Sequence, residues 1–304
     1  MTTIVYSDKY FANIGPHVFP AQKYRLVYDE IGKDGYLQSP SVQILQPRMP
    51  TRDELRFVHE DKYLDDVLGF RITPSTFSSE LPMRREVVEA FLLSSGGTLV
   101  AAESAVTTKK SVNLGGGFHH AFPDHAEGFC FFNDVAMACR MLLKEKKATR
   151  IAIVDCDLHQ GNGTAYIFRD EPNVFTFSIH QENNYPIKQT SDLDIGLDDG
   201  VGDDEYLKRL GGAIEQIQKE FRPDYVFYLA GADPFEDDQL GSLELTHEGF
   251  KRRDEMVVGT FCGADIPLCV VLAGGYSRDV RDTVRIHYNT CLRLFADDKD
   301  LKGE

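Results

Sequence analysis

The sequence predicts one α/β domain over residues 1–304, doubly wound, with a mostly parallel central sheet and helices on both faces. Strand-like and helix-like segments alternate along the whole chain, which is the pattern of such folds. The chain of 304 residues is long enough for one large domain, and no internal repeat or Pro/Gly/Ser-rich linker divides it.

Five short runs are apolar on both faces and rich in β-branched and aromatic residues, as buried parallel strands are: residues 111–114, 151–154, 174–179, 224–230 and 266–273. Amphipathic helices are predicted over residues 82–105, 134–146, 205–220 and 248–261. A further helix should begin near Thr51, because Thr51 and Glu54 have the spacing of a capping box. The acidic run 297–300 is predicted to be a short solvated tail.

Composition and charge narrow the range of functions. Hydrophobic residues make up 42% of the chain and charged residues 27%, as in ordinary soluble globular proteins. The formal net charge is −15 and the basic residues form no cluster, which argues against nucleic-acid binding. An acidic surface can attract cationic substrates or can simply keep the protein soluble, and both interpretations stay open.

Targeting signals and cysteines favour a cytoplasmic location. The sequence shows no signal peptide, no apolar run long enough to cross a bilayer and no basic localisation cluster, so no membrane insertion is expected. The cysteines at 130, 139, 156, 262, 269 and 291 include no C-x-x-C pair, and several lie inside apolar runs. They are therefore expected to be reduced core residues, not the ligands of a zinc ribbon.

Unusual polar residues follow four of the predicted strands. In doubly wound folds, ligands bind in the crevice beyond the carboxyl ends of the strands. The segments that begin there are Gly115-Gly116-Gly117-Phe118-His119-His120, Asp155-Cys156-Asp157-Leu158-His159, Gly231-Ala232-Asp233 and Gly274-Gly275-Tyr276.

Three of these residues predict a metal site. Asp157 and His159 are two apart in an extended segment, so their side chains point the same way. Asp233, from another strand end, would supply a third ligand. Two carboxylates and one imidazole suit a divalent transition ion with open coordination positions, as a catalytic zinc requires. An Asp-x-His pair alone is more often two solvated loop residues, but Asp233 and the tandem histidines favour the metal.

The neighbouring residues predict acid–base and oxyanion chemistry. His119 and His120 are adjacent in sequence, so we expect them to point to different sides and to act as acid–base groups, not as ligands of one ion. Asp155 and Asn162 are the nearest candidates to fix their other ring nitrogens. Tyr276 is either a core tyrosine or a hydroxyl donor to an oxyanion.

Together these segments resemble the histone deacetylase family. The similar strings are Gly117-Phe118-His119-His120-Ala121, Gly128-Phe129-Cys130-Phe131-Phe132-Asn133-Asp134, Asp155-Cys156-Asp157-Leu158-His159-Gln160-Gly161-Asn162-Gly163, Ala230-Gly231-Ala232-Asp233-Pro234 and Ala273-Gly274-Gly275-Tyr276. They occur in order over nearly the whole chain and are very specific as a set. The resemblance is closest to class IV, through residues 6–24 with His17, residues 59–63, and Gln160 with Asn162.

This resemblance implies an arginase/deacetylase-like fold and the zinc-dependent removal of acetyl or longer acyl groups from lysine ε-amines of peptides or proteins. Zinc, with ferrous iron left open, would be held by Asp157, His159 and Asp233. His120 would be the main general base, and His119, paired with Asp155, its electrostatic or acid partner. Tyr276 would bind the acyl carbonyl oxygen and then the oxyanion.

The resemblance also implies contacts around this centre. The Gly128 carbonyl would accept a hydrogen bond from the substrate amide, and Phe129 would line the tunnel; from the sequence alone, Phe129 might equally belong to the core. A potassium ion would be held by Asp155, Asp157, His159, Ser178 and Ile179. Many relatives have aspartate where this chain has Asn162. A neutral amide still orients His120 but stabilises its imidazolium less, which leaves the division of acid and base roles open.

Three alternatives compete with this interpretation. Arginase-type ureohydrolases need two manganese ions and a reversed Asp-x-His-x-Asp unit, whereas Asp-x-Asp-x-His followed by Gln160 supports one catalytic ion. An acetylpolyamine deacetylase needs an acidic residue at the tunnel rim, where this chain has Leu240, so acyl-lysine is favoured. A non-catalytic acyl-lysine binding module would lack a metal ligand, a histidine or Tyr276, and none of these is missing.

Overall fold

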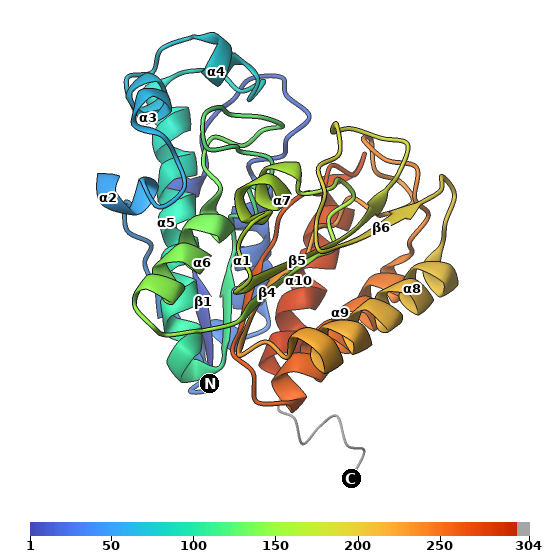
Figure 1. Cartoon of the computed structure of the whole chain (residues 1–304). Coiled ribbons are helices and arrows are strands. Elements are labelled where there is room, and N and C mark those ends of the chain that lie inside the picture. Colours follow the sequence, from blue (N-terminus) through green and yellow to red (C-terminus); the bar gives the residue numbers. More distant parts are fainter. Residues whose placement is uncertain (297–304) are drawn as a thin grey trace.

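The structure, a computed structural model, describes residues 1–296 and has at its centre an eight-stranded, all-parallel sheet (Figure 1). The strands are β1 Thr2–Val5, β2 Val42–Leu45, β3 Lys110–Asn113, β4 Ile151–Asp155, β5 Val174–Gln181, β6 Leu193–Leu197, β7 Tyr225–Leu229 and β8 Leu268–Val271. Their order across the sheet is β2-β1-β3-β8-β7-β4-β5-β6. The predicted fold class is confirmed, and the acidic run 297–300 lies outside the described residues.

Helices cover both faces of this sheet, as expected for a doubly wound fold. They are α1 Lys23–Lys33, α2 Arg52–Leu55, α3 Asp61–Leu68, α4 Pro74–Phe77, α5 Arg85–Thr108, α6 Asp134–Lys144, α7 Asn162–Phe168, α8 Asp203–Gln216, α9 His247–Gly263 and α10 Val280–Phe295. Helices α5, α6 and α7 pack side by side as one layer, and α1, α10, α9 and α8 form the other. Figure 1 shows α5 and α6 on the opposite side of the sheet from α8, α9 and α10.

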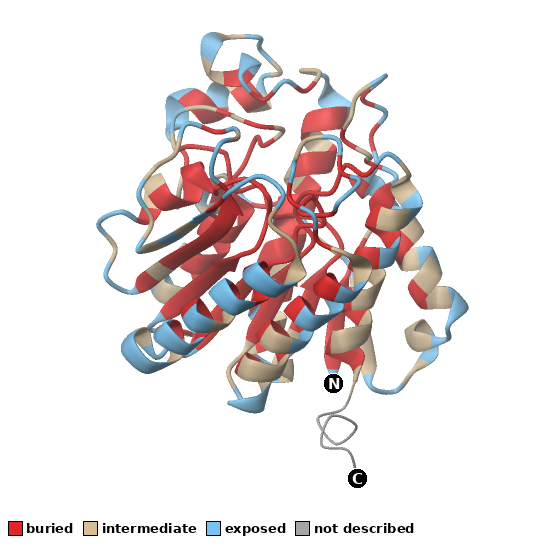
Figure 2. Ribbon diagram, turned by 90° about the vertical axis from the view of Figure 1, so that its right-hand side faces the viewer, coloured by how far each residue is buried: buried red, intermediate tan, exposed pale blue. Residues whose placement is uncertain are grey.

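The centre of the sheet is the most deeply buried part of the fold. Every residue of β4, β7 and β8 is buried, which is why these strands are apolar on both faces. Figure 2 shows the strands in the colour of buried residues, between helices whose outer faces are exposed. The residues that follow these strands therefore start from a buried support that is hydrogen-bonded on both sides.

Helix α5 is a core helix of unusual length and apolarity. Among the described helices it alone is long and apolar enough to cross a membrane, contrary to the expectation that no such run exists. It packs on β1 and β3, however, and 67% of its most apolar window is buried inside the fold. A buried core helix meets the same criteria, so the apolar composition of α5 is explained by its burial between the sheet and α6.

Five of the eight strands correspond to predicted ones, with small shifts at their ends. The predicted helix start at Thr51 is confirmed, since the Thr51 hydroxyl accepts from the Glu54 N–H and the Glu54 carboxylate accepts from the Thr51 N–H. The predicted helix over 205–220 ends at Gln216 and continues as a π-helical turn, Ile217–Phe221. Strands β1, β2 and β6 were not predicted.

The strands that carry the polar segments are neighbours. Strands β3, β8, β7 and β4 are the four central ones, and their register brings their carboxyl ends to one level. The glycine- and histidine-rich segment, the Asp-x-Asp-x-His unit, Asp233 and Tyr276 therefore meet above the middle of the sheet.

Candidate active site and metal centre

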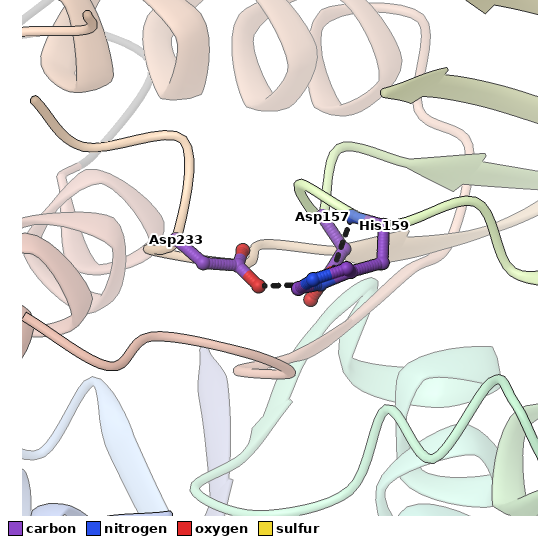
Figure 3. Close-up of side chains that lie close together, drawn as sticks. All are labelled: Asp157, His159 and Asp233. Carbon is purple, nitrogen blue, oxygen red and sulfur yellow. Dashed lines mark hydrogen bonds and ion pairs between the residues drawn. The ribbon is translucent and has the colours of Figure 1, made fainter. Parts of the chain in front are cut away.

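Asp157, His159 and Asp233 form a compact cluster above β4 and β7 (Figure 3). The Nδ1 atom of His159 lies 3.3 Å from Asp157 Oδ1 and 3.3 Å from Asp233 Oδ2. One possible ligand atom from each residue lies within 4.8 Å of the others, and all three residues are buried. The structure thus brings together the three residues predicted to be metal ligands.

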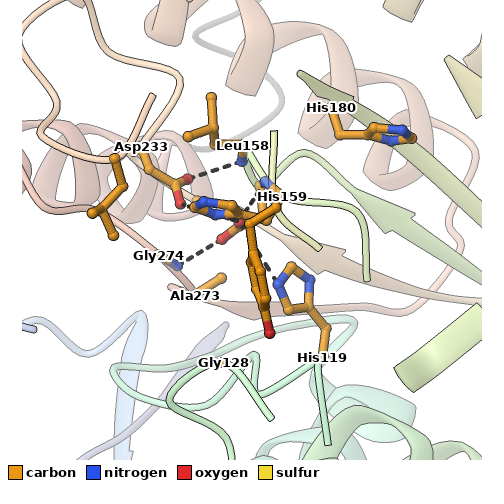
Figure 4. Close-up of polar contacts among 12 residues, drawn as sticks. His119, Gly128, Leu158, His159, His180, Asp233, Ala273 and Gly274 are labelled. Carbon is orange, nitrogen blue, oxygen red and sulfur yellow. Dashed lines mark hydrogen bonds and ion pairs between the residues drawn. The ribbon is translucent and has the colours of Figure 1, made fainter. Parts of the chain in front are cut away.

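Backbone N–H groups fix the other oxygen of each carboxylate (Figure 4). Asp157 Oδ2 accepts from the Gly274 N–H at 2.8 Å, and Asp233 Oδ1 accepts from the Leu158 N–H at 3.0 Å. A side chain at Gly274 would not fit, because its Cβ would lie 2.1 Å from Asp233 Oδ2. Asp233 Oδ2 itself is buried and accepts no hydrogen bond from the described residues. This buried carboxylate oxygen lies 3.3 Å from His159 Nδ1 and is available to a cation, as a metal ligand would be.

The electrostatics of the cluster also favour a cation. Burial, together with the charge of Asp157, raises the pKa of Asp233 to about 6. Burial alone would lower the pKa of His159, but its contacts with Asp157 and Asp233 raise it to about 10. A cluster that attracts a proton this strongly has the negative potential that a divalent ion needs.

His119 and His120 both face this cluster, and the expectation that they point to different sides is wrong. Their Nε2 atoms are 3.1 Å apart, and their ring centroids are separated by 4.1 Å. Alternation of side chains holds only for extended strands, and this segment is a turn in which Gly116 and Gly117 have φ of 76° and 82°. The prediction that both histidines are acid–base groups beside the metal does not depend on that premise.

Each histidine has the ring-nitrogen partner that was expected. His119 Nδ1 lies 2.7 Å from Asp155 Oδ2, and His120 Nδ1 lies 2.8 Å from Asn162 Oδ1. Burial alone would lower the pKa of His119, but the charges of Asp155 and Asp157 raise it to about 9. Burial and the neighbouring His119 and His159 hold the pKa of His120 well below its usual range. The pKa values of the two imidazoles are thus shifted in opposite directions, which is consistent with different roles for the two residues.

Tyr276 lines a small cavity beside the cluster, and two side chains hold its backbone in place. Its N–H donates to Asp238 Oδ2 at 2.7 Å, and its carbonyl oxygen accepts from Gln239 Nε2 at 2.7 Å. The second oxygen of Asp238 accepts from the Leu240 N–H at 2.9 Å. Asp238 therefore joins the rim residue Leu240 to the catalytic candidate Tyr276.

A passage beside the cluster consists of a narrow inner part and a wider outer part. The inner cavity has a volume of about 20 Å³ and is lined by the tandem histidines, Asp157, His159 and Tyr276. The outer cavity has a volume of about 200 Å³, and its lining residues are Glu80, His120, Gly128, Phe129, His159, Asn184, Tyr185, Leu240 and Tyr276. The three residues predicted to bind substrate, Gly128, Phe129 and Leu240, all line the outer cavity.

Gly128 and Phe129 form a tight turn at this passage. Their φ angles are 50° and 62°, and the turn is closed by hydrogen bonds between the backbones of Glu127 and Cys130. A Cβ on Gly128 would lie 2.6 Å from His120 Cδ2 and 2.7 Å from the Tyr185 hydroxyl. The ring of Phe129 contacts those of His17 and Tyr276 edge to face, with centroids 4.8 and 5.9 Å apart.

The residues expected to hold potassium lie on β4 and β5 and in the segment after β4. Asp155 pairs with Ser178 in the register of the two strands, which places Ile179 one residue further along β5. Asp155 Oδ1 accepts from the Asp157 N–H at 3.1 Å, and the Ser178 hydroxyl lies 2.9 Å from His180 Nδ1. The potassium site stays a prediction.

Sequence reasoning missed Tyr185, Glu80 and Glu127. Tyr185 and Glu80 line the outer cavity. Glu127 hydrogen-bonds to Tyr185 and to Asn162. Tyr185 follows β5, so the strand-end rule applied to that strand would have found it; no comparable signal marks the two glutamates.

Comparison with known proteins identifies similarity to the histone deacetylase domain over most of the chain. A family model described as the histone deacetylase domain matches residues 17–291. An uncharacterized protein of Picosynechococcus sp. is 42% identical, with 93% of this chain and 95% of that protein covered. Histone deacetylase 2 of Arabidopsis thaliana is 31% identical, with 91% and 75% covered. The acetoin utilization protein AcuC of Bacillus subtilis is 30% identical, with 86% and 73% covered.

A solved structure shows the same fold. The crystal structure of the HDA15 HD domain superposes with a TM-score of 0.81 at 24% identity. The match covers 98% of this chain and 92% of that one. The parallel sheet and its helices are therefore shared over nearly the whole length.

Proposed function

Because the chain belongs to the histone deacetylase family, and is therefore a hydrolase that acts on amides, we propose that it removes acetyl or longer acyl groups from lysine ε-amines of peptides or proteins. One observation carries the proposal. The cavity lined by the aromatic rings of Phe129 and Tyr185 leads to the ligand cluster, His120 and Tyr276. Such a passage fits the aliphatic chain of lysine and delivers its acyl-amide to that group of polar residues.

We propose zinc as the metal held by Asp157, His159 and Asp233, since two carboxylates and one imidazole leave open positions. When bound, the ion supplies a Lewis acid for the acyl carbonyl and lowers the pKa of a water molecule. Ferrous iron would suit the same donors. A structural potassium ion at Asp155, Asp157, His159, Ser178 and Ile179 is part of the same proposal, as is assignment to class IV.

The protein side chains then have distinct tasks. His120 Nδ1 faces the Asn162 carbonyl oxygen and carries the proton that it donates to this oxygen. The other ring nitrogen, Nε2, therefore has the free lone pair and accepts the proton of the attacking water. The Tyr276 hydroxyl donates to the oxyanion that forms as the water oxygen bonds to the acyl carbon. The C–N bond then breaks, and one of the two histidines returns the proton to the leaving amine. Both are placed to do so, because His119 Nε2 lies 3.1 Å from His120 Nε2.

The side chain at position 240 favours acyl-lysine over acetylpolyamines. Leu240 offers apolar contact to a substrate and itself supplies no charge for an ammonium group beyond the scissile amide; the carboxylate among the residues that line the outer cavity is that of Glu80. An unpaired cation in a partly desolvated entrance is costly, so a polyamine-specific rim would carry a carboxylate there. Small-molecule amides are the alternative substrate class.

A substrate panel tests the proposal. We expect lysine peptides of graded acyl length to give higher kcat/KM than acetylspermidine at physiological ionic strength, where surface attraction is screened. Leu240→Glu should shift the ratio of the two kcat/KM values toward acetylspermidine by about fivefold, which corresponds to one ion pair in a partly solvated rim. Leu240→Gln is the uncharged control. Faster turnover of acetylspermidine than of every acyl-lysine peptide by the wild type would refute the lysine assignment.

A further inference from the structure

Asn162 is one member of a longer chain of hydrogen bonds. Its Oδ1 lies 2.8 Å from His120 Nδ1, and its Nδ2 donates to Glu127 Oε1 at 2.8 Å. We infer that Glu127 is a positioning residue that holds Asn162, and through it His120, in the orientation that hydrolysis requires. This inference rests on the proposed role of His120 as the general base.

The chain has a defined direction. Because Glu127 is an acceptor when ionised, the Asn162 amide must turn its nitrogen toward it and its oxygen toward His120. The oxygen then accepts the Nδ1–H of His120, so that the proton-free nitrogen of the ring is Nε2, which faces the cavity. Without Glu127 the amide would have no group that distinguishes its two orientations at this end.

Glu127 is itself held in place and ionised. Its Oε1 also accepts from the Tyr185 hydroxyl at 2.9 Å, and its Oε2 lies 3.4 Å from His125 Nε2. Its side chain is only 21% exposed. Burial opposes ionisation, but the contacts with His125, Asn162 and Tyr185 bring the pKa of Glu127 below its usual value. The carboxylate is therefore a fixed negative charge on the side of Asn162 opposite His120.

The two tandem histidines are thus supported differently. His119 contacts the Asp155 carboxylate directly, whereas His120 reaches a carboxylate across one intervening amide. The negative charge of Glu127, which lies beside the Asn162 amide nitrogen, polarises the amide. The amide oxygen therefore becomes a stronger hydrogen-bond acceptor for His120. Glu127 in this way compensates for the neutral residue at position 162.

Exchanging the two functional groups tests the inference. Glu127→Gln should lower kcat for an acetyl-lysine peptide by about tenfold with KM nearly unchanged, as loss of an outer partner does. Asn162→Asp alone should also lower kcat, because it places two carboxylates against each other. The double variant restores one amide and one carboxylate in exchanged positions, and we expect its kcat to exceed that of both single variants. Additive losses in this double-mutant cycle would overturn the inference.

A measurement without substrate separates this inference from the proposed function. In ¹⁵N-histidine NMR spectra, Glu127→Gln should move the His120 ring-nitrogen signals. Glu60→Gln, which removes an exposed carboxylate outside the hydrogen-bond chain, should leave them in place. If Glu127→Gln does not fold, Glu127→Ala takes its place in the spectra. Unchanged His120 signals would overturn the positioning role, whereas a wild type inactive on every acyl-lysine peptide would refute only the proposed function.

Discussion

Replacing Gly128 by alanine should damage the active site through one methyl group. The residue has φ of 50°, and its Cβ would lie 2.6 Å from His120 Cδ2 and 2.7 Å from the Tyr185 hydroxyl. Gly35 provides a matched control, because its φ is 79° and a Cβ there would meet nothing within 4 Å. Both alanine variants are destabilised by the left-handed backbone conformation at the substituted residue, and only Gly128→Ala adds a steric clash.

The two contributions can be estimated separately. A left-handed conformation costs alanine about 1–2 kcal/mol, which should be the whole effect of Gly35→Ala. Overpacking of a well-filled site adds about 1–3 kcal/mol, so Gly128→Ala should lose that much more stability. His120 can escape the methyl group only by turning, which breaks its 2.8 Å contact with Asn162. A displacement of this kind costs about 10²-fold in kcat.

Urea unfolding of both variants, metal content and kcat on an acetyl-lysine peptide provide the assay. We expect Gly128→Ala to keep its metal, because none of the three ligand residues is among the nearest neighbours of the new methyl group. Gly35→Ala should keep both its metal and its kcat. If Gly128→Ala were as stable as Gly35→Ala and equally active, the tight contact between this turn and His120 would be refuted.

Three further predictions concern the metal, the oxyanion and pH. Asp233→Ala should abolish stoichiometric zinc in elemental analysis, whereas Asp224→Asn at the opposite end of β7 should retain it; full occupancy in the first variant would exclude Asp233 as a ligand. Tyr276→Phe should lower kcat by about 10²–10³ with little change in KM, and an unaltered kcat would leave Tyr276 only a packing role. Burial lowers the pKa of His59 to about 4, so the unfolded chain binds a proton below about pH 6.5 that the folded chain refuses. Stability should therefore fall as pH falls through this window, by up to about 1.4 kcal/mol per pH unit from this group, and urea unfolding of His59→Gln should show a shallower decline.

Much of the site could be predicted because it depends on strand ends. Asp157, His159, Asp233 and Tyr276 each follow a strand whose apolar composition is unmistakable, and parallel strands present their carboxyl ends at one edge. The facing orientation of His119 and His120 could not be predicted in this way. It depends on backbone angles in the preceding glycines, which the alternation of strand side chains does not describe.

The unpredicted strands lie toward the edges of the sheet. Residues of β2 are only half-buried, and β6 places Asp194 and Gly196 between apolar residues, so neither has the composition of a central strand. Glu127 escaped prediction for a different reason. Its partners Asn162 and Tyr185 are 35 and 58 residues away in sequence, and only the folded chain brings them together.

The two oxygens of Asp238 have a consequence for how this protein can change. One accepts from the backbone of Leu240 and the other from that of Tyr276, so the rim residue and the residue proposed to bind the oxyanion depend on a single carboxylate. An insertion or deletion between residues 236 and 241 should displace Asp238, and with it the backbone of Tyr276, while altering the entrance. On the proposed roles of Leu240 and Tyr276, exchanging the side chain at 240 should change the range of substrates, whereas grafting a whole loop from a relative should lower turnover.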